Sequence, residues 1–308
     1  MDMYQKREMR KNKKMNEDKK SLPSTGINWF PGHMAKTRRL IGEKYPLIDI
    51  VYEVVDARIP FSSKIKDIYN IIGNKPKIII MTKKDLCDIK VTENWIKYYE
   101  SLGNHVLLVD LNNTNDYEKI ISLTHELMAP VQAKRIDKGM KEKEIRALVV
   151  GIPNVGKSTL INRMCKRKVA GVANNPGVTK NLTWLRTHSD ILLLDTPGIL
   201  WPKLEGESAL NLATFTAIRQ EILPHDDVAV YILKKLSSCY PKILKEAYNL
   251  DEVTDENIME AYEIIGKSIG AIKGGEVDYD RVSIKIINDI KTEKIKGVTF
   301  DQRWKKVN

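Results

Sequence analysis

The chain of 308 residues is 42% hydrophobic and 30% charged, so it is long enough for two compact domains with apolar cores. Its three scattered cysteines have neither metal-ligand spacing nor an even framework, which excludes a disulfide-stapled secreted scaffold. No apolar stretch approaches the ~18 residues of a membrane span and no signal-peptide pattern begins the chain, so we expect a cytoplasmic protein with no membrane partner. The net charge of +11 indicates a polyanionic partner; RNA is preferred, because no basic amphipathic helix or lipidation motif supports an anionic membrane.

Residues 1–26 are predicted to form a disordered basic tail. Residues 1–20 carry eight lysines and arginines against four acidic residues, and they have almost no large apolar side chains. The tail is either a solubilising extension or an arm that contacts the partner, and its composition leaves both readings open.

Short apolar runs then alternate with helical patterns, which predicts an α/β fold with a mostly parallel sheet and helices on both faces. The expected strands are residues 47–55, 78–81 and 106–109, and the expected helices are residues 62–72, 91–101 and 117–128. A basic linker at residues 134–144 leads to a further expected strand at 145–150.

The motif Thr82-Lys83-Lys84-Asp85 follows the strand 78–81 directly. An aspartate at its end can accept hydrogen bonds from the N1–H and the exocyclic amine of guanine, a pattern that adenine lacks. Thr82, Lys83 and Asp85 are therefore candidate base-binding residues, although Thr82 replaces the usual asparagine. Taken alone, the motif could also be a solvated charged turn. The loop that backs the guanine is expected near residues 110–114, where no single residue stands out.

A phosphate-binding motif lies between the strand 145–150 and a predicted helix at 158–165. Its glycines let the backbone approach closely, so that consecutive N–H groups and the helix N-terminus can face the phosphates. Lys157 is expected to reach the β- and γ-phosphates, and the Ser158 hydroxyl to bind Mg²⁺. The predicted nucleotide-binding residues of this loop are Pro153, Asn154, Val155, Gly156, Lys157, Ser158 and Thr159.

Further Mg²⁺ and γ-phosphate candidates lie downstream. The strand 191–194 ends in Asp195-Thr196-Pro197-Gly198, where Asp195 can act on Mg²⁺ and the Gly198 N–H can meet a γ-phosphate. Thr179 is the candidate switch threonine that contacts Mg²⁺ only when the γ-phosphate is present. The predicted magnesium site thus consists of Ser158, Thr179 and Asp195.

The two nucleotide motifs occur in an unusual order. In an ordinary small GTPase the phosphate loop comes first and the base-reading motif last, whereas here the base-reading motif precedes the phosphate loop by about seventy residues. Because both motifs serve one nucleotide, the inversion predicts a circularly permuted P-loop GTPase domain, which we assign to residues 27–203. GTP is the expected substrate.

After this domain, periodic apolar residues predict a smaller all-helical C-terminal domain at residues 204–308. Its expected helices are residues 209–222, 228–239, 241–248, 255–265 and 279–292. Lys273-Gly274-Gly275 lacks the strand and the terminal hydroxyl of a phosphate loop, so it is interpreted as a turn between helices.

Four segments carry a specific family resemblance: Asn-Trp-Phe-Pro-Gly-His-Met-Ala-Lys at 28–36, Asp-Ile-Val-Tyr-Glu-Val-Val-Asp-Ala-Arg-Ile-Pro at 49–60, the phosphate loop at 151–162, and Leu-Asp-Thr-Pro-Gly-Ile-Leu-Trp-Pro-Lys at 194–203. They resemble the ribosome biogenesis GTPase A proteins, also called YlqF, a family of circularly permuted GTPases. The resemblance runs from about residue 27 to the C-terminus. It implies GTP hydrolysis coupled to late assembly of the large (50S) ribosomal subunit, with the precursor particle and its ribosomal RNA as partners. It also implies that the helical domain at residues 204–308 contacts this RNA. We expect a monomer.

The residue that positions the attacking water is not the usual one. Ile199 stands where many GTPases have a glutamine, and its side chain can neither donate nor accept a hydrogen bond. His33 is the catalytic candidate, because an imidazole can hydrogen-bond a water near neutral pH and the family resemblance assigns the matching histidine this role. The alternative is a structural histidine that closes a Pro-Gly turn.

Asn154 is also a candidate ligand for K⁺. Its side-chain carbonyl could help to bind a monovalent cation beside the β–γ bridge, where other GTPases use an arginine finger. Resemblance to potassium-stimulated GTPases supports this reading, and an asparagine tolerated in a turn is the alternative.

Two functions remain open at this stage. The first is an assembly GTPase whose hydrolysis is stimulated by the ribosomal particle. The second is a non-ribosomal nucleotide switch that recruits protein partners, with an incidental positive charge.

Overall fold

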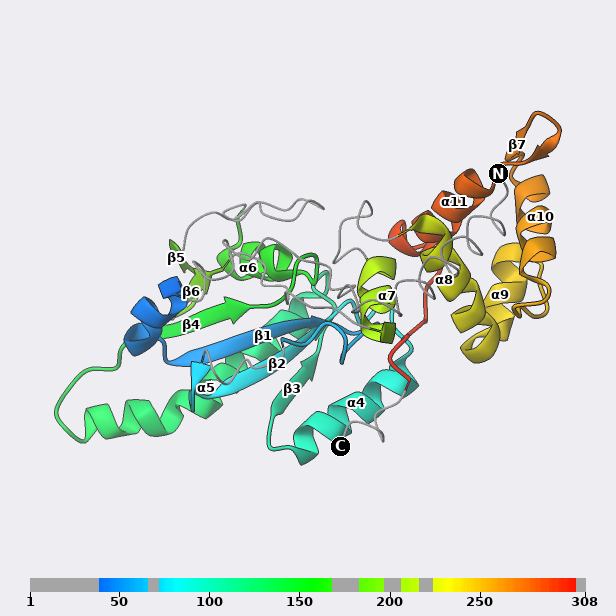
Figure 1. Ribbon diagram of the computed structural model, residues 1–308. Coiled ribbons are helices and arrows are strands. Elements are labelled where there is room, and N and C mark those ends of the chain that lie inside the picture. The colour runs from blue at the N-terminus through cyan, green and yellow to red at the C-terminus, as the bar shows by residue number, and fades with distance from the viewer. Residues whose placement is uncertain (1–38, 66–71, 168–182, 197–205, 216–223, 303–308) are drawn as a thin grey trace, which may run out of the picture. The chain divides into compact units, whose positions relative to one another are not determined.

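The computed structural model describes residues 39–65, 72–167, 183–196, 206–215 and 224–302 (Figure 1). These residues fall into two compact units, one built around a six-stranded sheet and one helical. Of the described residues, 206–215 and 224–295 belong to the helical unit, and the chain from Lys296 onwards belongs again to the sheet unit. This last segment was predicted to be part of the helical domain.

The large sheet has the strand order β3-β2-β1-β4-β6-β5 (Figure 1). Its strands are β1 (Ile50–Asp56), β2 (Lys77–Thr82), β3 (His105–Leu108), β4 (Ile145–Val150), β5 (Thr183–Arg186) and β6 (Ile191–Asp195). All neighbouring pairs are parallel except β5 and β6, which are antiparallel. The predicted mostly parallel sheet is confirmed, and β5 is an edge strand that the sequence analysis did not predict.

The register brings the functional loops to one edge of the sheet. β4 lies between β1 and β6, with Glu53 opposite Val150 and Asp195 opposite Val149. Asp56 at the end of β1 is opposite Thr82 at the end of β2. Because parallel strands end at the same edge, the loops after β1, β2, β4 and β6 gather there, as expected for a ligand site in an open α/β sheet.

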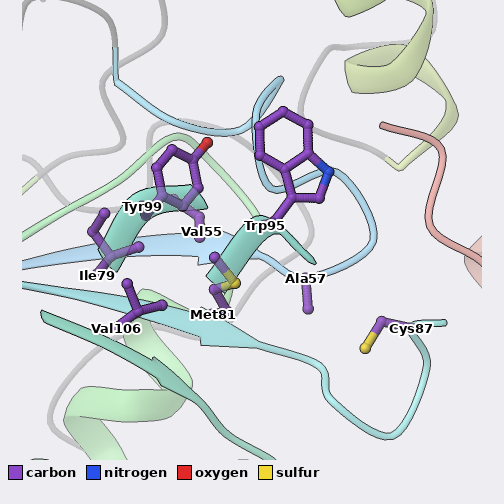
Figure 2. Close-up of a cluster of buried hydrophobic side chains, with 8 residues drawn as sticks. All are labelled: Val55, Ala57, Ile79, Met81, Cys87, Trp95, Tyr99 and Val106. Atoms are coloured by element: carbon purple, nitrogen blue, oxygen red, sulfur yellow. The ribbon is translucent and has the colours of Figure 1, made fainter. Parts of the chain in front are cut away.

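Helices cover both faces of the sheet, as predicted. They are α4 (Ile89–Ser101), α5 (Thr114–Ile136) and α6 (Lys157–Cys165), and a short 3-10 turn, η1 (Tyr45–Leu47), precedes β1. Alternate side chains of a strand point to opposite faces. On one face Val55 and Ile79 form a buried cluster with Trp95 of α4 (Figure 2). On the other face the hydroxyl of Tyr52 hydrogen-bonds that of Thr124 in α5 at 2.6 Å.

Local signals account for the helix boundaries. The Asp88 side chain caps α4 by accepting from the Val91 N–H, and that of Asn113 caps α5 by accepting from the Asn115 N–H. The helix predicted at 62–72 lies largely outside the described residues; residues 61–63 form turns.

The helical unit comprises α7 (Gly206–Thr214), α8 (His225–Cys239), α9 (Pro241–Tyr248), α10 (Ile258–Ser268) and α11 (Tyr279–Lys291). α11 packs on α8 through apolar faces that include the fully buried Leu233, Leu236, Ile286 and Ile290. At the Gly274-Gly275 turn the chain forms a small hairpin of β7 (Ile272–Lys273) and β8 (Glu276–Val277), in which both glycines have positive φ. Among the helices described, none has the length and apolarity that a bilayer crossing requires.

Candidate nucleotide-binding site

The phosphate loop joins β4 to α6 through two residues with positive φ. Gly156 caps α6 with a φ of 95°, and Asn154 has a φ of 63°. Gly151 passes so close to β1 that a Cβ there would lie 2.5 Å from the main-chain oxygen of Val54. Glycine is therefore needed where the loop leaves the sheet and where it enters the helix, and the resulting turn suits a phosphate at a helix N-terminus.

Lys157 is buried within this loop, and its Nζ donates to the main-chain oxygen of Ile152 at 2.7 Å. Burial lowers the pKa of the Lys157 ammonium to about 8, against the opposing effect of the Asp195 carboxylate. A negatively charged phosphate would favour the charged ammonium. The side chain can thus exchange a carbonyl partner for a phosphate.

The donor set beside the loop suits Mg²⁺. Asp195 ends β6 and is 5% exposed, while Ser158 lies in the first turn of α6. The Thr196 hydroxyl donates to the Val149 main-chain oxygen at 2.7 Å, which fixes the end of β6 against β4. A carboxylate and a hydroxyl are the oxygen ligands that Mg²⁺ prefers.

The base-reading motif contacts the phosphate loop directly. The Thr82 hydroxyl donates to the main-chain oxygen of Val155 at 2.6 Å. Lys83, which has a φ of 62°, donates from Nζ to the main-chain oxygen of Asn154 at 2.9 Å. Two motifs far apart in the chain are therefore parts of one site. Thr82 stands where the usual residue of this motif is asparagine, and its hydroxyl anchors the motif to the phosphate loop through this hydrogen bond.

The comparisons with known proteins agree with this geometry. A "Ribosome biogenesis GTPase A" from Priestia megaterium is 48% identical over 278 residues, covering 89% of this chain and 96% of that protein. The protein of the same name from Bacillus licheniformis is 46% identical and covers 90% of this chain and 98% of that protein. This chain belongs to the ribosome biogenesis GTPase A family.

Two further comparisons describe the domain and the fold. The profile of a family described as "50S ribosome-binding GTPase" matches residues 146–263, a range that begins at β4 and leaves out the base-reading motif. The crystal structure of GNP-bound YlqF from T. maritima is 23% identical and has a TM-score of 0.60, covering 88% of this chain and 99% of that chain. At this identity the likeness supports the fold alone.

A buried charge network at the end of β1 was not predicted from the sequence. Asp56 is 2% exposed and accepts from Arg58 Nε at 3.0 Å, from Arg58 Nη2 at 2.8 Å and from Lys83 Nζ at 2.6 Å. Burial alone would raise the pKa of Asp56, but the charges of Arg58 and Lys83 outweigh it and hold the pKa well below its usual range. One feature of the sequence could have indicated this network. Asp56 is a carboxylate at the end of a buried strand, at the sheet edge that carries the nucleotide motifs.

The loop after β3 lies beside both nucleotide motifs. The Lys84 N–H donates to the Val109 main-chain oxygen at 3.3 Å, and the Leu111 side chain approaches Gly156. Asp116 accepts from the Asp110 N–H at 2.9 Å. This loop, Val109 to Asn113, overlaps the segment predicted to back the guanine, and Asp85 of the base-reading motif is exposed.

Three of the predicted site residues, His33, Thr179 and Gly198, lie outside the described residues. Their roles in this member of the GTPase A family stay predictions. Of the other predicted residues, Pro153 and Val155 are buried, whereas Asn154, Ser158 and Thr159 are partly exposed around the phosphate loop.

Proposed function

We propose that this protein is an assembly factor that binds and hydrolyses GTP during late maturation of the large (50S) ribosomal subunit. GTP is converted to GDP and phosphate. The observation that carries the proposal is the direct hydrogen bonding between the base-reading motif and the phosphate loop, in a chain that is 48% identical to a ribosome biogenesis GTPase A over nearly its whole length.

Nucleotide binding uses the two joined loops. Pro153 to Thr159 surround the phosphates, and Thr82, Lys83 and Asp85 form the base end of the site. Ser158, Thr179 and Asp195 hold Mg²⁺, which when bound neutralises charge on the phosphates. The Gly198 N–H meets the γ-phosphate.

Two elements distinguish the proposed hydrolysis from that of an ordinary GTPase. His33 positions the attacking water, since Ile199 cannot do so. Asn154 contributes to a K⁺ site beside the β–γ bridge. The side-chain carbonyl of Asn154 would supply the oxygen ligand, and the residue is partly exposed in the phosphate loop.

The partner is the precursor of the large subunit, contacted as a monomer in the cytoplasm. The net charge of +11 favours contacts with ribosomal RNA. Differential affinity of the GTP and GDP states for the particle then determines when the factor leaves.

The test compares GTP hydrolysis with and without purified large subunits, together with co-sedimentation in the presence of a non-hydrolysable GTP analogue. Stimulated hydrolysis and salt-dependent co-sedimentation are expected. Loss of all ribosome association at low salt with the analogue would instead favour the non-ribosomal switch. A Lys157→Ala variant, which lacks the phosphate-binding ammonium, is the control for nucleotide dependence.

A further inference from the structure

The segment that follows α11 is well buried. Val298, Thr299 and Phe300 are 0% exposed, and Asp301 is 8% exposed. We call Lys296 to Gln302 the C-terminal strap, and it lies in the sheet unit.

One group of strap contacts holds the loop that follows the base-reading motif. The N–H groups of Gly297 and Val298 donate to the main-chain oxygen of Leu86, at 2.9 and 3.3 Å. The N–H of Asp88 donates to the Thr299 hydroxyl at 3.1 Å. Leu86 directly follows Asp85, the residue expected to read the guanine base.

A second group holds the loop that follows β1. The Phe300 N–H donates to the Arg58 main-chain oxygen at 2.7 Å, and the Thr299 hydroxyl lies 3.3 Å from the Ala57 main-chain oxygen. The Asp301 carboxylate accepts from the N–H groups of Phe61 and Ser62, both at 2.8 Å, and from the Ser62 hydroxyl at 2.7 Å.

The strap therefore connects the two loops whose alignment the nucleotide site needs. Asp56 ends β1 and Arg58 lies in the loop that follows it, and the loop after β2 carries Lys83 and Asp85. Lys83 reaches both Asp56 and the phosphate loop. A shift of the β1 loop would move Asp56 away from the Lys83 ammonium. A shift of the loop after β2 would move Lys83 away from the Asn154 carbonyl and Asp85 away from a bound base.

We propose that Thr299 and Asp301 of the C-terminal strap are positioning residues for guanine nucleotide binding. They act through the loops at Ala57–Ser62 and Leu86–Asp88, and they touch neither nucleotide nor metal. The alternative, a clasp that only stabilises the fold, is disfavoured because the strap bonds Ala57, Arg58 and Leu86, each adjacent to or within a nucleotide-site element.

The inference rests on GTP binding by this site, so the experiment first measures binding of GDP and of IDP to the unaltered protein. Inosine lacks the exocyclic amine that Asp85 accepts from, so the ratio of the two dissociation constants reports the alignment of Asp85. If the unaltered protein binds neither nucleotide, the proposed function fails rather than the strap.

Asp301→Ala leaves the N–H groups of Phe61 and Ser62 without their acceptor. We expect GDP to bind about tenfold more weakly and the preference for GDP over IDP to fall about threefold. Thr299→Val keeps the side-chain shape and removes the hydroxyl. We expect it also to lower the GDP affinity and the preference for GDP over IDP. Asp301→Asn, which retains an acceptor oxygen, should recover part of the loss.

The matched control is Asp49→Ala. Asp49 also accepts a main-chain N–H, that of Arg146 at 3.0 Å, and a lysine, Lys143, at 2.5 Å, but it precedes β1 at the opposite edge of the sheet. It should lower thermal stability without changing the preference for GDP over IDP.

Unchanged GDP affinity and an unchanged GDP/IDP ratio in folded Asp301→Ala would overturn the proposal. If Asp301→Ala does not fold, Thr299→Val and Asp301→Asn decide the question by the same two measurements.

Discussion

Lys83 donates a hydrogen bond to the main-chain oxygen of Asn154 at 2.9 Å, although 71 positions separate the two residues in the chain. The bond joins the loop after β2 to the phosphate loop after β4. Its geometry depends on Asp56, which holds the same ammonium at 2.6 Å. A single lysine thereby connects three strand ends of the permuted domain.

Replacing Lys83 tests this connection. Lys83→Met keeps the length of the side chain and removes the ammonium, so the phosphate loop loses one hydrogen bond and Asp56 loses one of its cations. We expect GDP to bind about tenfold more weakly, as measured by titration calorimetry. Lys84→Met is the matched control, since the Lys84 side chain is 41% exposed and its ammonium lies 3.9 Å from Asp116. Equal effects of the two substitutions would contradict a specific role for Lys83.

The buried charge of Asp56 predicts a pH-dependent contribution to stability. Asp56→Asn leaves Arg58 and Lys83 without their anionic partner, and we expect it to lower the free energy of unfolding by about 3 kcal/mol near neutral pH. The folded-state pKa of Asp56 is depressed, so its contribution is complete above the unfolded-state value and declines as pH falls towards the folded-state value.

The measurement is urea unfolding of both proteins at a series of pH values. The difference between them should shrink as the pH falls below the ordinary aspartate value of about 4. A difference that is constant across this range would mean that the Asp56 charge is not what stabilises the network.

Much of the sheet unit was predictable because its strands are buried on both faces. β1, β2, β4 and β6 are near-continuous runs of isoleucine, valine and leucine, the pattern of a covered parallel sheet. β5 gives no such signal, since it is a four-residue antiparallel edge strand. The nucleotide motifs were also predictable, because their chemistry requires specific residues at fixed spacing.

The role of Asp56 and of the strap could not be predicted in the same way. The partners of Asp301 lie about 240 positions earlier in the chain, and nothing local marks that pairing. No motif surrounds Val298 and Phe300 in the sequence, and their complete burial shows only in the fold. Long-range main-chain bonds are set by topology rather than by residue spacing.

Replacing K⁺ by Na⁺ tests the proposed ligand role of Asn154. The smaller ion requires a different arrangement of oxygen ligands, so hydrolysis should be slower in Na⁺ at equal ionic strength. In Asn154→Ala the two salts should give similar rates. Unchanged GDP affinity in this variant would indicate that only the cation is lost, whereas weaker GDP binding would indicate a disturbed phosphate loop. Equal rates in K⁺ and Na⁺ for the unaltered protein would refute a cation requirement.

His33→Ala tests the proposed water-positioning group. We expect stimulated turnover to fall by about a hundredfold, the usual contribution of a general acid or base, with GTP affinity nearly unchanged. Single-turnover hydrolysis with large subunits measures the stimulated turnover, and a separate binding titration measures the GTP affinity. A comparable loss of GTP binding would point to a structural histidine.

The lowered pKa of Lys157 predicts that nucleotide binding takes up a proton in mildly alkaline solution. In the free protein the ammonium begins to lose its proton near pH 8, because burial disfavours the charge. Bound phosphates favour the charged form, so GDP affinity should decline as pH rises above about 8, by up to tenfold per unit. Free-protein stability should change in the opposite sense, since above this pH the unfolded chain binds the extra proton.

Calorimetry in two buffers of different ionisation enthalpy measures the proton uptake directly. At about pH 8.5 we expect a substantial fraction of one proton per GDP bound, and close to none at about pH 7. Uptake near zero at both values would mean that Lys157 is already fully charged before the nucleotide arrives. In that case its bond to Ile152 would hold a permanent cation in the loop, and phosphate binding would only replace one partner with another.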